Sequence, residues 1–134
     1  MKSLIQLSNS NLPFIEITVY YNNQSIRLPH VLIDTGSSST ILKLDIVEEI
    51  GLTVELDDVL GTISGVGGSE FVFFKTVDAI EMNGFRIENF QVDIGTMDYG
   101  INIDGIIGMD FLLRAIGIID LNELILIFQQ KQEV

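Results

Sequence analysis

Short runs of apolar and β-branched residues, separated by turn-forming residues, cover most of the 134-residue chain. Residues 14–20 read FIEITVY, which is rich in the β-branched and aromatic residues that favour strands. Asn22 and Asn23 follow, and because asparagine tolerates a positive φ, this pair is typical of a hairpin turn. Residues 25–34 then return as the second strand, so this part of the chain is predicted to form a β-hairpin.

A second, glycine-rich hairpin is predicted in the middle of the chain. Residues 61–74 read GTISGVGGSEFVFF, which indicates two extended arms joined by a glycine-rich tip. The second arm continues toward Met82, where Asn83 and Gly84 form a strong hairpin signal. Residues 85–94 are predicted to be the next strand.

One helix is predicted between these two hairpins. In residues 43–50 the apolar positions Leu44, Val47 and Ile50 are spaced by three, with acidic residues between them. Gly51 follows directly, and glycine is the residue that most often ends a helix.

The last third of the chain predicts a strand, a short helix and a final hairpin. Residues 105–115 read GIIGMDFLLRA, an apolar strand that breaks at Gly108 before a brief helix with Asp110 in its first turn. A hairpin is expected around residues 121–123. About nine strands and two short helices follow from these patterns, so we predict an all-β domain with antiparallel strands, closed or sandwiched.

The length suits one domain, residues 1–134. Hydrophobic residues make up 47% of the chain, but no apolar run approaches the roughly 18 residues that a membrane helix needs. The N-terminal segment MKSLIQLSNSNLPF lacks both the apolar block and the cleavage site of a signal peptide. We therefore expect a soluble, cytoplasmic domain without a membrane span.

Composition excludes several kinds of site. The chain has no cysteine, so disulfides, thiolate nucleophiles and cysteine-bound zinc are ruled out. Its single histidine, His30, is interpreted as a strand-edge residue and not as a catalyst. The formal net charge is −12, and an acidic chain repels phosphate backbones, so nucleic acid is not expected as a partner.

The segment VLIDTGSSST, residues 31–40, places Asp34 at the end of an apolar strand, where an unpaired charge is costly. A purely structural explanation is that the carboxylate accepts hydrogen bonds from the following turn. An aspartyl-phosphate site would need a lysine or second aspartate close by, and the glycine-rich segment 61–68 lacks the lysine of a phosphate-binding loop. A metal site that combines Asp34 with Asp45 or Asp104 has no supporting spacing, so no metal or cofactor is expected.

A pair of carboxylates explains more of this segment. Two carboxylates about 3 Å apart share one proton, so that one acts as a general base on water and the other as a general acid. Thr35 can hold such a turn, Gly36 allows close approach of a backbone, and Ser37 can donate to the carboxylate. The chain contains one Asp-Thr-Gly, so the second carboxylate has to come from a second copy, which implies a two-fold homodimer.

At this point the sequence resembles the retropepsin-like aspartic proteases, single-domain relatives of pepsin. Three features carry the resemblance: the signature at residues 32–37, the glycine-tipped hairpin at 65–68, and Ile-Ile-Gly at 106–108 followed by the helix at 109–114. They occur in the family's order from about residue 14 to residue 128. The resemblance implies a closed acid-protease β-barrel or sandwich with one or two short helices, active as a homodimer.

The resemblance also implies the role of each site residue. Asp34 is the catalytic carboxylate, Thr35 makes reciprocal hydrogen bonds across the dimer axis, and Gly36 offers its carbonyl to the substrate. Residues 63–71 are the flap, a hairpin that closes over an extended peptide. The expected substrate-binding residues are Ser37, Ile63, Gly65, Val66, Gly67 and Gly68. Leu32 and Ile106 are further candidates for the pocket, together with Val66.

The expected function is therefore that of an aspartic endopeptidase acting on peptides or proteins. In viral members an Asp–Arg ion pair supports the dimer, but the corresponding positions here are Ser38 and Met109, which leaves a viral-type interface in doubt. A hydrogen bond from Ser37 to the carboxylate would favour its ionised form and lower the working pH. The alternative is a catalytically weak or inactive module that binds peptides or dimerises.

Overall fold

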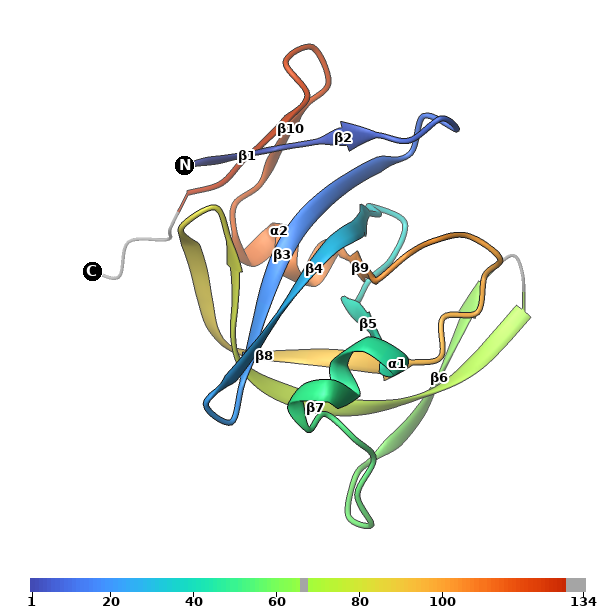
Figure 1. Ribbon diagram of the computed structural model, residues 1–134. Coiled ribbons are helices and arrows are strands. Elements are labelled where there is room, and N and C mark those ends of the chain that lie inside the picture. Colours follow the sequence, from blue (N-terminus) through green and yellow to red (C-terminus); the bar gives the residue numbers. More distant parts are fainter. Residues whose placement is uncertain (66–67, 130–134) are drawn as a thin grey trace.

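The computed structural model describes residues 1–65 and 68–129 (Figure 1). Its strands are β1 (Lys2–Leu4), β2 (Gln6–Leu7), β3 (Pro13–Tyr21), β4 (Gln24–Ile33), β5 (Ile41–Lys43), β6 (Leu60–Gly65), β7 (Gly68–Met82), β8 (Phe85–Gly95), β9 (Gly105–Ile107), β10 (Ile118–Asp120) and β11 (Ile125–Ile127). Its helices are α1 (Leu44–Val47), the 3₁₀ helix η1 (Glu48–Ile50) and α2 (Met109–Arg114). The predicted all-β class with short helices is confirmed.

The main sheet closes on itself as a barrel. Its eight strands follow the order β2-β3-β4-β9-β5-β8-β7-β6, and an additional pairing of β3 with β7 joins the two halves. The prediction that the strands are antiparallel is wrong in two places, because β4 pairs with β9 and β5 with β8 in parallel. Turn residues in the sequence predict pairing only between strands that follow each other along the chain. β9 lies between β4 and β5 in the sheet although it is distant from both in the sequence.

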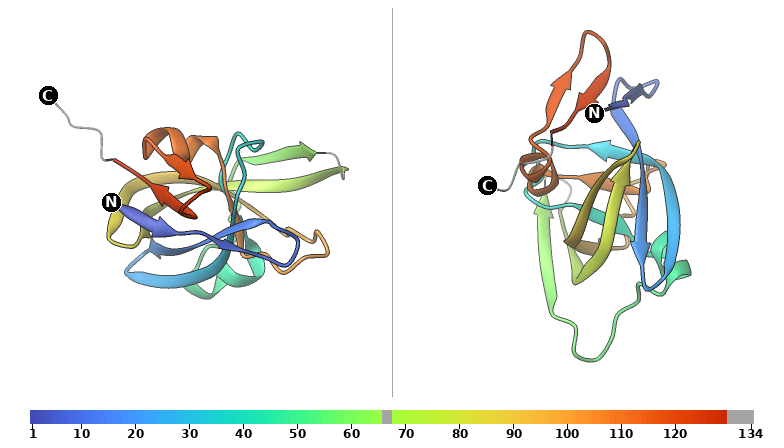
Figure 2. Two further views of the ribbon diagram at one scale, coloured as in Figure 1. Left: turned by 90° about the horizontal axis from the view of Figure 1, so that it is seen from above. Right: turned by 90° about the vertical axis from the view of Figure 1, so that its left-hand side faces the viewer.

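A smaller sheet lies beside the barrel and joins the two ends of the described chain. Its order is β1-β11-β10, with both pairings antiparallel, and Figure 2 shows the β10–β11 hairpin standing next to β1. Strands β1, β2 and β5 have three residues or fewer, too short for a periodic pattern to reveal them. This explains why the sequence predicted fewer strands than the structure describes.

Two of the predicted hairpin turns adopt the expected conformations. Asn22 and Asn23 have φ values of 51° and 63°, and Asn83 and Gly84 have 44° and 87°, so both hairpins turn through left-handed residues.

The predicted helix at 43–50 is divided into α1 and η1. Gly51 ends it in the left-handed conformation, with φ of 88°, which glycine adopts without steric cost.

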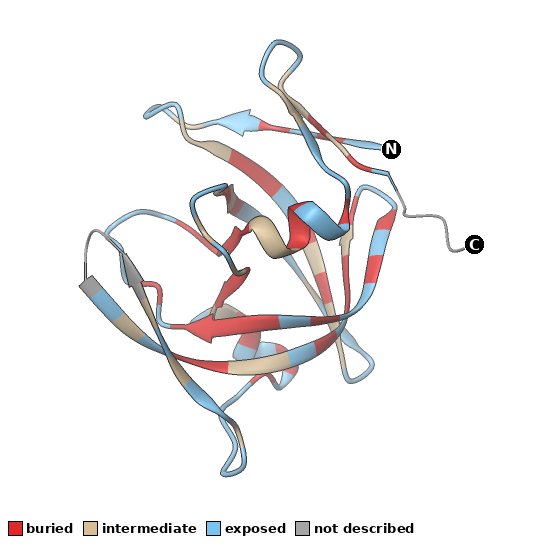
Figure 3. Ribbon diagram, turned by 180° about the vertical axis from the view of Figure 1, so that it is seen from behind, coloured by how far each residue is buried: buried red, intermediate tan, exposed pale blue. Residues whose placement is uncertain are grey.

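Most buried hydrophobic residues belong to one cluster, and Figure 3 shows buried positions along the barrel strands and in α2. A second, smaller cluster of buried side chains includes residues of β3, β5 and β9. This cluster consists of Phe14, Ile41, Met97, Ile103 and Ile106.

In the described parts of the chain, no helix is long and apolar enough to cross a membrane.

Candidate active site

Asp34 is positioned by the strand pair β4–β9. The parallel pairing aligns Leu32 with Ile106 and Ile33 with Ile107, and the N–H of Asp34 donates to the Ile107 carbonyl at 2.9 Å. Ile33 is buried, whereas Asp34 is only partly covered. The pairing of β4 with β9 therefore fixes the point at which the Asp34 carboxylate leaves the sheet.

The turn after β4 closes through the Asp34 side chain itself. The N–H of Gly36 donates to Asp34 Oδ1 at 2.8 Å, and the N–H of Ser37 donates to the Asp34 carbonyl at 3.1 Å. The structural explanation of Asp34 as a turn acceptor thus holds for one carboxylate oxygen. Thr35 and Gly36 lie exposed at the outer side of the turn.

Ser37 does not make the hydrogen bond that the sequence predicted. Its hydroxyl donates to the Ser39 carbonyl at 2.7 Å instead of to the Asp34 carboxylate. Its own carbonyl accepts from the N–H of Met109 at 2.8 Å, so Ser37 joins the turn to the start of α2. The expectation of a lower working pH, which depended on donation to Asp34, therefore has no support in the single chain.

Thr40 and Asp110 hold the turn from behind, and the sequence did not identify this role. The buried Thr40 hydroxyl donates to Asp110 Oδ1 at 2.8 Å and accepts from the N–H of Gly108 at 3.2 Å. The N–H of Thr40 donates to Asp110 Oδ2 at 3.1 Å. Asp110 also accepts from the N–H of Phe111 at 2.7 Å, so the predicted helix-start charge is present but serves the turn as well.

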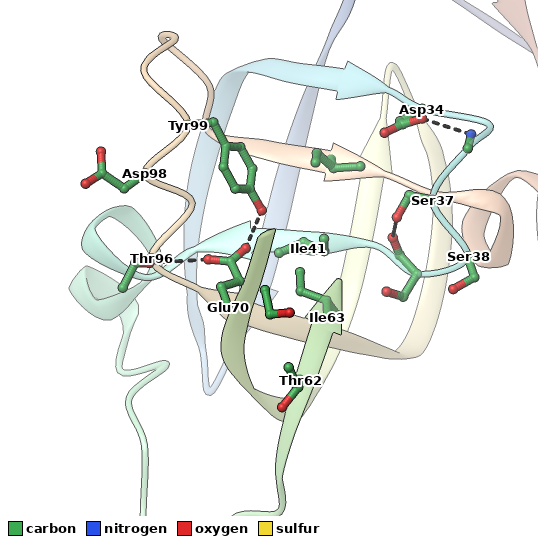
Figure 4. Close-up of a pocket in the computed structure, with 14 residues that line it drawn as sticks. Asp34, Ser37, Ser38, Ile41, Thr62, Ile63, Glu70, Thr96, Asp98 and Tyr99 are labelled. Atoms are coloured by element: carbon green, nitrogen blue, oxygen red, sulfur yellow. Dashed lines mark hydrogen bonds between the residues drawn. The ribbon is translucent and has the colours of Figure 1, made fainter. Parts of the chain in front are cut away.

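A cleft of about 890 Å³ opens beside the Asp34 turn. Figure 4 shows Asp34 at one side of this cleft and Glu70 at the opposite side, with Ile41 and Ile63 between them. Its lining residues are Asp34, Gly36, Ser37, Ser38, Ser39, Ile41, Thr62, Ile63, Ser69, Glu70, Thr96, Asp98, Tyr99 and Ile106. A volume of this size is typical of ligand-binding sites, which span roughly 300–1,000 Å³.

Comparison with known proteins now decides the family. The family model described as aspartyl protease matches residues 17–111, a segment that includes the Asp34 turn, the β6–β7 hairpin and Gly108. The chain belongs to the aspartyl protease family. Both the family and the fold class predicted from the sequence are confirmed.

The chain is similar to one curated protein and to one solved structure, the second of which shows the fold. The DNA damage-inducible protein 1 of Saccharomyces cerevisiae is 26% identical over 118 residues, which cover 87% of this chain and 26% of the yeast protein. The chain thus spans about a quarter of the length of that relative. A crystal structure of a retropepsin-like aspartic protease from Rickettsia conorii matches with a TM-score of 0.66 and 18% identity, covering 95% of this chain and 98% of that one. This member of the aspartyl protease family thus has the retropepsin-like fold.

Only some of the site residues predicted from the sequence line the cleft. Ser37, Ile63, Gly36 and Ile106 line the cleft together with Asp34. Thr35 and Leu32 are not among the lining residues. Gly65 and Gly68 pair with each other at the ends of β6 and β7, and Val66 and Gly67 lie outside the described residues. The substrate-binding roles of these residues stay predictions.

The sequence did not identify Glu70, Thr96 and Tyr99, which line the cleft on the side away from Asp34. Glu70 accepts hydrogen bonds from the Tyr99 hydroxyl, from the Met97 N–H at 3.1 Å and from the Thr96 hydroxyl at 3.3 Å. Burial, and secondarily the hydrogen bond to Glu70, raises the pKa of the Tyr99 phenol well above its ordinary value, so the phenol keeps its proton. No motif marks these residues, because they meet only through the fold.

Asp93 is a buried carboxyl directly behind the active-site turn. It is 6% exposed, accepts from the Ser39 hydroxyl at 2.7 Å, and its N–H donates to the Thr40 carbonyl at 2.9 Å. Burial raises the pKa of Asp93, the Ser39 hydroxyl opposes this shift, and the negative charge of Asp110 adds to it. Asp93 thus couples the turn to β8.

The residues discounted from the sequence have structural roles. Asp104 is buried and accepts a hydrogen bond at 2.9 Å from the N–H of His30, 74 residues away in β4, so its carboxylate joins the loop before β9 to β4. His30 is exposed on β4, and its ring contacts Phe14 edge-on at 5.8 Å between centroids. Within residues 1–65 and 68–129, no three histidine, aspartate or glutamate side chains are grouped so that they could hold a metal ion.

Proposed function

We propose that this member of the aspartyl protease family is an active endopeptidase that uses Asp34 from two copies of the chain. The proposal rests on the hydrogen bonding of the Asp34 carboxylate, which lies at the edge of the cleft. Its Oδ1 is held by the Gly36 N–H, whereas Oδ2 accepts no hydrogen bond from any residue that the structure describes. A fixed carboxylate with one oxygen available is what a general base acting on water requires.

The second carboxylate has to come from another molecule. The other acidic residues that line the cleft are Glu70 and Asp98, and Figure 4 shows both on the side away from Asp34. Glu70 is already occupied by three donors. Thr35 and Gly36 are exposed at the outer side of the turn, so this surface is open to the same turn of a second copy. A two-fold homodimer would place both Asp34 side chains at its axis.

The reaction then follows from one proton shared by two carboxylates. The ionised Asp34 removes a proton from water while the water oxygen bonds to the peptide carbonyl carbon, and the protonated Asp34 gives its proton to the carbonyl oxygen. The C–N bond of the tetrahedral intermediate breaks as the amide nitrogen receives the proton taken from water. One hydroxyl of the intermediate returns its proton to the other Asp34, which releases a carboxylic acid and an amine and restores the shared proton. Two chains and water are sufficient, so this route uses no cofactor.

An extended peptide is the substrate that fits the cleft. The β6–β7 hairpin runs along one wall, and we propose that it acts as the flap and hydrogen-bonds the peptide as an added strand. Ile41, Ile63 and Ile106 offer apolar contacts for substrate side chains. No lysine or arginine is among the described lining residues, and the chain carries a net charge of −12, so strongly acidic peptides would bind poorly.

The proposal is tested by digesting a denatured protein mixture between about pH 3.5 and 7 with the wild type and with Asp34→Asn. The molar mass of each protein is measured by light scattering under the same conditions. Cleavage by a dimeric wild type but not by a dimeric Asp34→Asn protein would support the proposal. A dimeric wild type without cleavage would contradict it and favour a peptide-binding module. Cleavage by both proteins would also contradict it, because Asp34 would not be required.

A further inference from the structure

The outer part of the β6–β7 hairpin leaves the barrel before it ends. The last pair between β7 and β8 joins Val72 to Gly95, and beyond it the strand pairing of residues 68–71 is with residues 62–65 of β6. We call these two segments, 62–65 and 68–71, the outer hairpin. Figure 2 shows this hairpin extending sideways beyond the rest of the barrel. Some other contact therefore has to fix its position over the cleft.

Glu70 supplies that contact just beyond the last β7–β8 pair. It lies two residues past Val72, and its donors come from the segment that directly follows β8. Glu70 Oε2 accepts from the Met97 N–H at 3.1 Å and the Thr96 hydroxyl at 3.3 Å, while Oε1 accepts from the Tyr99 hydroxyl. The Glu70 side chain thus connects β7 to the segment after β8 at a point where the backbone pairing of the two strands no longer does so.

The backbone around this contact is shaped to receive the carboxylate. A Cβ added to Gly95 would lie 3.3 Å from Glu70 Cδ and 3.1 Å from Val72, closer than side chains usually pack. Met97 has a φ of 52°, a left-handed conformation that is uncommon for a residue other than glycine or asparagine. Its side chain is fully buried in the cluster below the cleft, while its N–H donates to Glu70. Core packing therefore holds the donor in place.

The same contact determines where the cleft-facing residue of β6 lies. Glu70 is the cross-strand partner of Ile63, so the two side chains project from the same face of the hairpin. Ile63 lines the cleft and packs against the buried cluster that contains Met97. A shift of Glu70 away from segment 96–99 would therefore move Ile63 and the adjoining backbone relative to Asp34.

We propose that Glu70 is a positioning residue, which anchors the outer hairpin to segment 96–99 and so sets the width of the substrate cleft. This inference rests on the proposed peptidase function. It assigns Glu70 no part in the chemical step, because Figure 4 shows it on the opposite side of the cleft from Asp34. Loss of the anchor weakens substrate binding and leaves the rate of the bound complex nearly unchanged.

The test compares the wild type with Glu70→Gln, which keeps the side-chain shape but removes the charge and one acceptor. With a peptide that the wild type cleaves, KM should rise about 3- to 10-fold while kcat changes less than about 2-fold. Tyr99→Phe removes one donor and should raise KM in the same direction, and the double variant should not exceed the sum of the two effects. Glu49→Gln, which changes an exposed glutamate of η1, is the matched control and should leave KM unchanged.

A second readout needs no activity. The Met97 amide donates to Glu70, so its hydrogen exchange measured by NMR should accelerate about 10-fold or more in Glu70→Gln but not in Glu49→Gln. Unchanged KM and unchanged Met97 exchange in Glu70→Gln would overturn the inference, as would a fall in kcat with constant KM. If the wild type shows no cleavage that depends on Asp34, the proposed function fails, and the exchange of Met97 alone then decides whether Glu70 anchors the hairpin. Tyr99→Phe provides the same exchange test if Glu70→Gln does not fold.

Discussion

Gly108 lies directly against the backbone of Ser39, although the two residues belong to distant parts of the chain. A Cβ added to Gly108 would lie 2.3 Å from the Ser39 carbonyl oxygen and 2.9 Å from that of Ser37. Both partners are backbone atoms of the active-site turn, and they cannot rotate away as a side chain could. Only glycine therefore allows the β9–α2 junction to pass behind Asp34.

Gly108→Ala should consequently disrupt both the fold and the turn. The added methyl group has to displace backbone, so we expect a loss of about 3 kcal/mol in the free energy of unfolding and little peptidase activity. Denaturant unfolding monitored by circular dichroism measures the first effect. Gly117→Ala is the control, because its nearest contacts would be at 3.4 to 3.6 Å, an ordinary packing distance. Equal stability of the two variants would contradict the steric explanation.

Thr40→Val should weaken the support behind the turn without changing the shape of the side chain. The valine leaves the Gly108 N–H without its acceptor and removes a donor from Asp110, and residue 40 is fully buried. We expect the free energy of unfolding to fall by about 2 kcal/mol, since buried polar groups without partners cost this much. Urea unfolding gives the value. The exposed Thr53→Val change is the control, and a similar loss there would argue against a specific role of Thr40.

Asp93 should make stability depend on pH in the direction opposite to most carboxylates. Because burial raises its pKa above the ordinary value of 3.8, the folded protein binds this proton more tightly than the unfolded chain does. The resulting stabilisation is complete below pH 3.8 and is lost as the pH rises through the folded pKa. Asp93→Asn cannot ionise, so the variant should gain stability relative to the wild type as the pH rises from about 3.8 toward 7. Thermal unfolding across this range tests the sign, and a constant difference between the two proteins would refute it.

Lys75 should fix the segment before β6 through two carboxylates. Its ammonium group lies 3.1 Å from Glu55 Oε1 and 3.0 Å from Asp58 Oδ2, and its side chain is only 9% exposed. The hydrogen bond from the Glu55 backbone N–H, and secondarily Lys75, lowers the pKa of Asp58. The stabilisation of the folded state by the ionised Asp58 is therefore present above the ordinary pKa of 3.8 and is lost as the pH falls through the folded pKa.

Lys75→Met should therefore speed proteolytic cleavage within residues 53–59 at neutral pH, with a smaller difference from the wild type below about pH 3. Limited proteolysis followed by mass spectrometry locates the cuts. Lys2→Met, at an exposed position in β1, removes the same charge and should not change the pattern. Identical cleavage of the wild type and Lys75→Met at neutral pH would show that the ion pairs do not hold this segment.

The sequence by itself determined the features that depend on local conformation. Asn22–Asn23 and Asn83–Gly84 could be identified as turns because a positive φ is a preference of these residues wherever they stand. The Asp34 turn was predictable because it is also local: it closes within four residues through hydrogen bonds to Asp34 itself. Runs of β-branched and aromatic residues likewise predicted the long strands, and the break at Gly108 predicted the start of α2.

Only the tertiary structure decided the contacts between segments distant in the sequence. Thr40 and Asp110 are 70 residues apart, and Glu70 and Tyr99 are 29 apart, so no local preference of either partner indicates the other. The parallel pairs β4–β9 and β5–β8 were missed for the same reason. Ser39 and Asp34 are both close to Ser37 in the sequence, so local preference did not decide which of them accepts its hydrogen bond. A hydrogen bond goes to whichever group the closed barrel brings within about 3 Å, and that distance is a property of the packed chain.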